Sequence, residues 1–217
     1  RQDDPAPTPL PVTDDIETTT TSGGLFDRWF ALATGPDLRS DVYLVREGEP
    51  RRRVELPGSD TYDEECPAFA PATATSDSDA ERLMIIRRAT DDAAQGDGDA
   101  ELVIVEVDDG GSVSPERTIP LDGLGVVQGN VPCASWSPDG NWAALGGTGA
   151  IWVVNTSSGE VRQLPGYQPT DLEWRPGTDE LAITGEESVE GETRADYSTD
   201  TPVTVYRAST GEARTLG

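Results

Sequence analysis

Histidine and lysine are both absent from this chain of 217 residues, which also has only two cysteines and one methionine. Without histidine there is no Ser-His-Asp triad, no histidine ligand for haem and none of the common histidine-containing zinc sites. No run of 18 or more consecutive apolar residues is present, so the sequence predicts no membrane-spanning helix. We therefore expect a protein that is not an enzyme and has no cofactor.

The charge is strongly one-sided. The 16 cationic side chains, all arginines, face 41 Asp and Glu, which gives a net charge of −25. Such a field repels phosphate backbones and anionic membranes, so we expect no nucleic-acid partner and favour basic or cation-bridged protein partners. A second interpretation is that the acidity only makes a secreted or salt-adapted protein soluble.

The N-terminal residues differ in composition from the rest. Residues 1–24 are rich in proline and threonine, which predicts an extended linker or arm of the kind that follows a signal peptide or membrane anchor. We expect an exported protein, extracellular or at the cell envelope. The remaining residues, 25–217, contain most of the 23 glycines, and glycine and proline together suit a domain of many short strands and turns.

A unit of two parts recurs along residues 25–217. The second part is an apolar run, a glycine-containing turn and a short run that closes at Leu56, Leu121, Leu164 or Leu216. The first part precedes three of the four units and has an aromatic residue two positions before a proline, at Phe69, Trp136 and Trp174. Each unit predicts a small antiparallel sheet, with boundaries near 25–58, 59–123, 124–166 and 167–217.

One of these units supports a family resemblance. The sequence Trp-Ser-Pro-Asp-Gly at 136–140, followed by an alternating apolar strand, resembles the signature of TolB-like, WD-repeat-like β-propellers. The match is partial in the fourth unit, where Arg175 and residues 178–179 depart from it, and weakest in the second. The resemblance implies an all-β propeller of about four four-stranded blades, with the three aromatic residues packed between blades.

The form of the propeller stays open. A small closed ring, an arc of a larger ring, and two chains that pair their arcs are all compatible with four units, and a β-sandwich is the competing fold. The first unit has no evident inner strand, and the threonine-rich residues 17–22 are a candidate for it.

Three residues share the position three before the aromatic residue, namely Cys66, Cys133 and Asp171. In a propeller these positions lie on neighbouring inner strands, so we expect a Cys66–Cys133 disulfide and an oxidising compartment. Asp171 is a candidate to face the channel, either as a ligand for a cation or as a hydrated carboxylate. Calcium would be the preferred ion for the acidic loops, but no spaced calcium-loop motif occurs, and the metal-binding residues stay unknown.

For function, the sequence and the resemblance together predict an extracytoplasmic protein-interaction or sensor and scaffold module. The long loops 72–80, 88–100 and 186–200 are candidate recognition surfaces. Two alternatives are the non-catalytic propeller part of a larger hydrolase and a structural subunit of an extracellular assembly, the latter as a homo-oligomer.

Overall fold

The chain is built from β-strands, as the repeated units predict. The computed structural model describes residues 28–34, 40–72, 80–89, 100–121, 133–147, 150–165, 167–187 and 203–216. Within these ranges there is no α-helix, and one turn of 3-10 helix is η1 (Ser59–Thr61). No helix among them is long and apolar enough to cross a membrane.

The strands form four antiparallel sheets, which we call blades 1 to 4. Blade 1 contains β1 (Phe30–Thr34), β2 (Asp41–Val45) and β3 (Arg52–Arg53). Blade 2 contains β4 (Tyr62–Phe69), β5 (Glu81–Ala89), β6 (Ala100–Val107) and β7 (Val113–Pro120). Blade 3 contains β8 (Ser135–Trp136), β9 (Trp142–Gly147), β10 (Ala150–Asn155) and β11 (Val161–Pro165). Blade 4 contains β12 (Tyr167–Trp174), β13 (Glu180–Glu187), β14 (Val203–Arg207) and β15 (Glu212–Leu216).

Each blade is a meander in which every strand pairs with its neighbours in the sequence. The middle strands of blades 2 and 3 are continuous apolar runs rather than alternating ones, because both faces of those sheets are covered by other sheets. The turns between the third and fourth strands each contain a glycine with positive φ, at Gly48, Gly111, Gly159 and Gly211. Glycine adopts this conformation without the steric cost that other residues pay.

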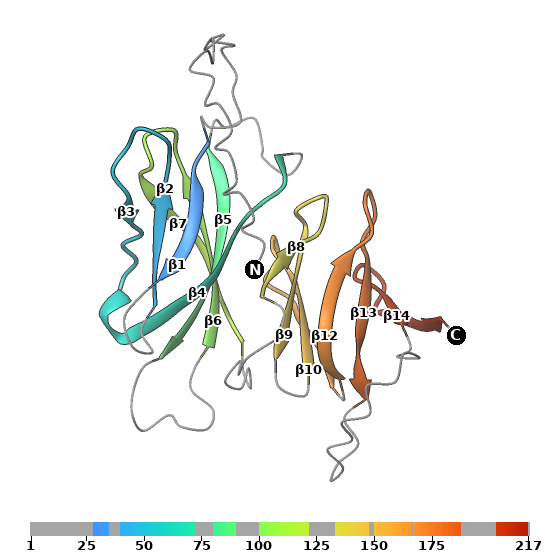
Figure 1. Ribbon diagram of the computed structural model, residues 1–217. Coiled ribbons are helices and arrows are strands. Elements are labelled where there is room, and N and C mark those ends of the chain that lie inside the picture. Colours follow the sequence, from blue (N-terminus) through green and yellow to red (C-terminus); the bar gives the residue numbers. More distant parts are fainter. Residues whose placement is uncertain are drawn as a thin grey trace, which may run out of the picture.

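The blades follow one another in a row and pack face to face (Figure 1). Three apolar clusters fill the spaces between blades 1 and 2, blades 2 and 3, and blades 3 and 4. Blade 1 and blade 4 lie at opposite ends of the row, which makes the described blades an open arc (Figure 1). The chain is therefore an all-β propeller of four blades, and the predicted fold class is confirmed.

Blade 1 differs from the others because it has three strands among the described residues. Its β1 pairs with β2 as the second strand of a blade does, so the innermost position is the one without a described strand. The candidate for that strand, residues 17–22, lies outside the described residues, as do most of the three long loops.

Candidate functional site

The aromatic residues that the sequence singles out lie between blades. The indole Nε1 of Trp136 donates a hydrogen bond to the carbonyl of Ala68 at 2.8 Å, and that of Trp174 donates to Ser135 at 3.3 Å. Both acceptors belong to the inner strand of the preceding blade. Phe69 holds the same position in blade 2 and packs against the cluster shared with blade 1. It has no donor, and the described part of blade 1 has no inner strand to accept one.

The two cysteines form a disulfide between Cys66 and Cys133, whose Cα atoms lie 5.3 Å apart. The bridge joins β4 of blade 2 to the segment that leads into β8 of blade 3. At this point β4 is irregular: its register with β5 shifts between Glu65 and Ala68, and Cys66 has a positive φ of 52°. Such a bulge re-aims a side chain, here toward the next blade.

Asp171 follows a similar irregularity in β12, where the register with β13 shifts between Pro169 and Asp171. Its Oδ1 accepts a hydrogen bond from the amide of Leu172 at 2.9 Å, and the side chain is exposed. Because Leu172 and Trp174 face blade 3, strand alternation places Asp171 on the opposite, open side of blade 4. Among the described residues no three Asp, Glu or Cys side chains are grouped so as to hold a metal ion, so no calcium site is assigned.

A set of arginines that the sequence did not single out connects the blades. The outermost strand of each blade has an arginine opposite an equivalent position of the third strand. The four pairs are Arg52 with Leu44, Arg117 with Ile104, Arg162 with Val153, and Arg214 with Val205.

In the first three blades this arginine reaches the turn between the third and fourth strands of the following blade. Arg52 donates to the carbonyl of Gly110, and Arg162 donates to the carbonyl of Ala208 at 2.5 Å. The Nη1 atom of Arg117 lies 3.6 Å from the place that a Cβ would take at Gly159. We call this arrangement, an outer-strand arginine on the next blade's turn, the arginine clasp.

The clasp also lies over an aromatic ring in two blades. The guanidinium of Arg52 is 5.3 Å from the ring centre of Trp29, and that of Arg162 is 5.3 Å from the ring centre of Trp142. Each ring belongs to the same blade as its arginine, so these cation–π contacts hold the guanidinium in place within its own blade.

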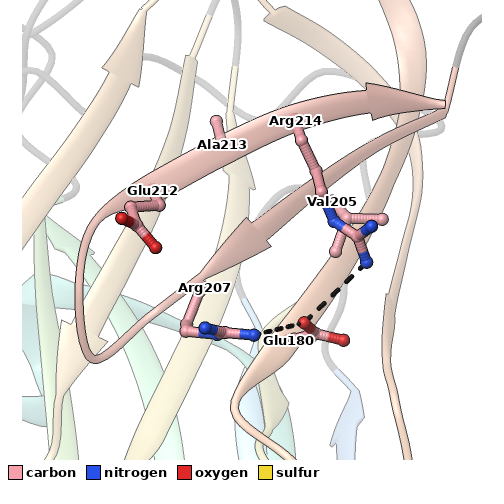
Figure 2. Close-up of a pocket in the computed structure, with 6 residues that line it drawn as sticks. All are labelled: Glu180, Val205, Arg207, Glu212, Ala213 and Arg214. Carbon is pink, nitrogen blue, oxygen red and sulfur yellow. Dashed lines mark hydrogen bonds and ion pairs between the residues drawn. The ribbon is translucent and has the colours of Figure 1, made fainter.

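Blade 4 has the clasp arginine, and no blade follows it among the described residues. Arg214 extends over the open face of blade 4 toward Glu180 (Figure 2). Glu180 occupies in blade 4 the position that Trp142 occupies in blade 3. Arg214 and Glu180 line a hollow of about 540 Å³. The guanidinium of Arg214 is 3.9 Å from the Glu180 carboxylate, beyond hydrogen-bond distance. Arg175 and Arg207 do bond to that carboxylate, each at 2.8 Å. Three guanidinium groups thus surround one carboxylate on a chain whose net charge is −25.

These contacts keep the carboxylate ionised. Hydrogen bonds from Arg175 and then Arg207 hold the pKa of Glu180 below its ordinary value, and the same ion pair raises the pKa of Arg207. Glu212 also lines this hollow and Asp171 lies on the same open face, so arginines and carboxylates are interspersed there. Arg214, at 3.9 Å from Glu180, is placed to bind a carboxylate from a partner.

Blade 1 has an open face at the other end of the arc. Phe30 and Leu32 are 53% and 55% exposed. The positions that correspond to them in the other blades are at most 1% exposed, and are occupied by Leu83, Ile85, Ala143, Leu145, Leu181 and Ile183. On the same face Arg51 lies over the ring of Tyr43 at 4.8 Å. Blade 1 thus keeps large apolar side chains at the positions that contact a preceding blade elsewhere in the chain.

The turn of blade 1 at Glu47, Gly48 and Glu49 is open as well. A Cβ at Gly48 would meet nothing within 4 Å, whereas the equivalent positions at Gly159 and Gly211 lie against a clasp arginine. This turn is acidic, and a hydrogen bond from Arg46 keeps the pKa of Glu49 below its ordinary value.

Comparisons with known proteins agree with the fold. No protein-family model and no curated protein matches the chain. Three solved structures are similar: a protein described as TolB from Agrobacterium tumefaciens, the β-propeller domain of the Trilobed protease from Pyrococcus furiosus, and the complex of the fission yeast SREBP–SCAP binding domains. They are 17%, 13% and 10% identical, with TM-scores of 0.45, 0.46 and 0.46 over 87% of this chain.

The chain covers 61%, 53% and 45% of those three chains. The all-β propeller that the sequence resemblance implies is confirmed by the four blades of the structure itself. Similarity this distant says nothing about activity or partners.

Proposed function

We propose that this chain is an extracytoplasmic, non-enzymatic protein-interaction module that docks proteins on the open faces of its end blades. One observation carries the proposal: Phe30 and Leu32 are half-exposed at positions that the other three blades bury. Exposed apolar clusters with aromatic side chains and arginine are typical of protein interfaces, and Tyr43 with Arg51 completes such a cluster on blade 1.

The charge supports a protein partner over a nucleic acid or an anionic membrane. The net charge of −25 repels both, while a protein can match the local pattern of each end face. A non-enzymatic role is supported by the absence of histidine, the most common general base, from the chain.

The disulfide supports an exported protein, because disulfides persist mainly in oxidising compartments. Mass spectrometry after alkylation of the chain from its native host, without reductant, tests this part. We expect no alkylated cysteine, and two alkylated cysteines would contradict export.

A photo-crosslinking amino acid at position 32 tests the docking face. In the native host we expect a crosslinked product of one discrete mass from position 32. The matched position is Thr118, which is exposed on the outermost strand of blade 2, and we expect no product from it. Absence of a discrete product from position 32 would overturn the proposal.

A further inference from the structure

The clasp arginines form a series whose last member has no turn to bind. Arg52, Arg117 and Arg162 each lie against the turn of the next blade. Arg214 has the same register position in blade 4, and its nearest described carboxylate is that of Glu180, at 3.9 Å. The face around it keeps small apolar side chains, Val205 and Ala182, at positions that pack against a following blade elsewhere.

The turns form a second series whose first member has no arginine. Those of blades 2, 3 and 4 each receive the clasp of the preceding blade, whereas the turn at Glu47 to Glu49 of blade 1 receives none among the described residues. Within the part of the chain that the structure describes, the arc therefore ends in a clasp without a turn on one side and a turn without a clasp on the other.

The geometry points to a second copy of this chain as the occupant of these faces, with blade 4 of one copy docked on blade 1 of the next. Arg214 then lies on the turn at Glu47 to Glu49 as Arg162 lies on the turn at Gly211. Phe30 and Leu32 of the second copy cover Val205 and Ala182 of the first. This inference rests on the proposed function, whose docking faces it assigns to one partner.

Charge complementarity favours this occupant. On the blade 4 face the guanidinium of Arg214 lies 3.9 Å from Glu180, and on the blade 1 turn the carboxylate of Glu47 is exposed, whereas Glu49 pairs with Arg46 and Arg52. The attraction of Arg214 for Glu47 favours docking of blade 4 on blade 1, because these residues lie at the clasp and at the turn that have no partner blade among the described residues. A contact between unlike faces closes into a ring when the rotation allows it and otherwise extends into a filament.

The first measurement is the molar mass of the full chain by light scattering during size exclusion, from about 1 to 100 μM, a range that detects micromolar affinity. We expect species of at least twice 23.1 kDa. Charge reversal by Arg214→Glu or by Glu47→Arg should each raise the dissociation constant at least tenfold, and the double variant should restore association. Arg28→Glu is the matched control, since Arg28 is 66% exposed against 62% for Arg214 and bonds within the arc to Glu81.

The direction of docking is tested by mixing Glu47→Cys with Arg214→Cys. The two native cysteines, Cys66 and Cys133, are bonded to each other, so neither has a free thiol that could react with the introduced cysteines. We expect a disulfide between the two different variants and none between two Glu47→Cys chains. A monomer at every concentration, or association that Arg214→Glu leaves unchanged, would overturn the inference. If the position 32 crosslink then joins a protein of another mass, the docking face survives and the second copy does not.

Discussion

The indole Nε1 of Trp136 donates a hydrogen bond to the carbonyl of Ala68 over 2.8 Å and so ties the inner strand of blade 3 to that of blade 2. Trp136 is 8% exposed, and its ring belongs to the apolar cluster between the two blades. The side chain therefore contributes both a buried ring and a directed bond.

These two contributions can be separated. Trp136→Phe keeps most of the ring and loses the bond, which should cost about 1 kcal/mol of unfolding free energy, whereas Trp136→Ala should cost about 3–5 kcal/mol. Urea denaturation measures both. Equal losses for the two variants would show that the ring does not pack between blades.

The Cys66–Cys133 disulfide closes a loop with a sequence separation of 67 residues. Its removal by Cys66→Ser with Cys133→Ser should lower the unfolding free energy by about 2–4 kcal/mol, because the unfolded chain gains freedom. Thermal denaturation of wild type with and without reductant checks the same effect. A melting temperature unaffected by reductant would contradict the predicted bridge between blades 2 and 3.

The ring of Trp29 packs directly against Gly111, the glycine in the turn between β6 and β7. Gly111 has a φ of +74°, and a Cβ there would come within 2.5 Å of the Trp29 ring. Gly177 has a φ of +71° with nothing within 4 Å, so Gly177→Ala should cost only the roughly 1–2 kcal/mol of a left-handed alanine. Gly111→Ala should cost distinctly more in urea denaturation, and equal costs would show that Trp29 is not held against this turn.

The arginines around Glu180 give a pH dependence with a definite sign. Because its pKa is lowered from 4.5 in the folded chain, mainly by Arg175, the ionised carboxylate stabilises the fold above pH 4.5, and this contribution is lost as the pH falls through the lowered value. Glu180→Gln should therefore be less stable than wild type at pH 7, with the difference closing in acid. Stability measured from pH 7 to pH 3 checks this, and a constant difference would contradict it.

Much of the fold could be predicted from the sequence because each blade repeats the same local signals. Apolar runs separated by glycine turns predicted the antiparallel sheets, and the aromatic residue two positions before a proline marked the ends of inner strands at Phe69, Trp136 and Trp174. The position shared by Cys66 and Cys133 predicted the disulfide.

The clasp arginines were not predictable in the same way. Their equivalence depends on strand register, and the bulge between Ile104 and Val105 changes the number of residues between the turn glycine and Arg117. Simple alignment of the repeats therefore does not bring Arg52, Arg117, Arg162 and Arg214 together. The open face of blade 1 could not be predicted for another reason. Phe30 and Leu32 have the sequence pattern of buried strand residues, and they are exposed only because blade 1 lies at the end of the arc.

The unfolding free energies of Leu32→Asp and Leu145→Asp, compared by urea denaturation of dilute protein, test the open blade 1 face most directly. The two leucines hold equivalent positions in blades 1 and 3, with exposures of 55% and 0%. An open docking face predicts a change below about 1 kcal/mol for Leu32→Asp and a loss above about 3 kcal/mol for Leu145→Asp. Large losses in both variants would show that the chain itself covers Leu32 and would contradict a docking face on blade 1.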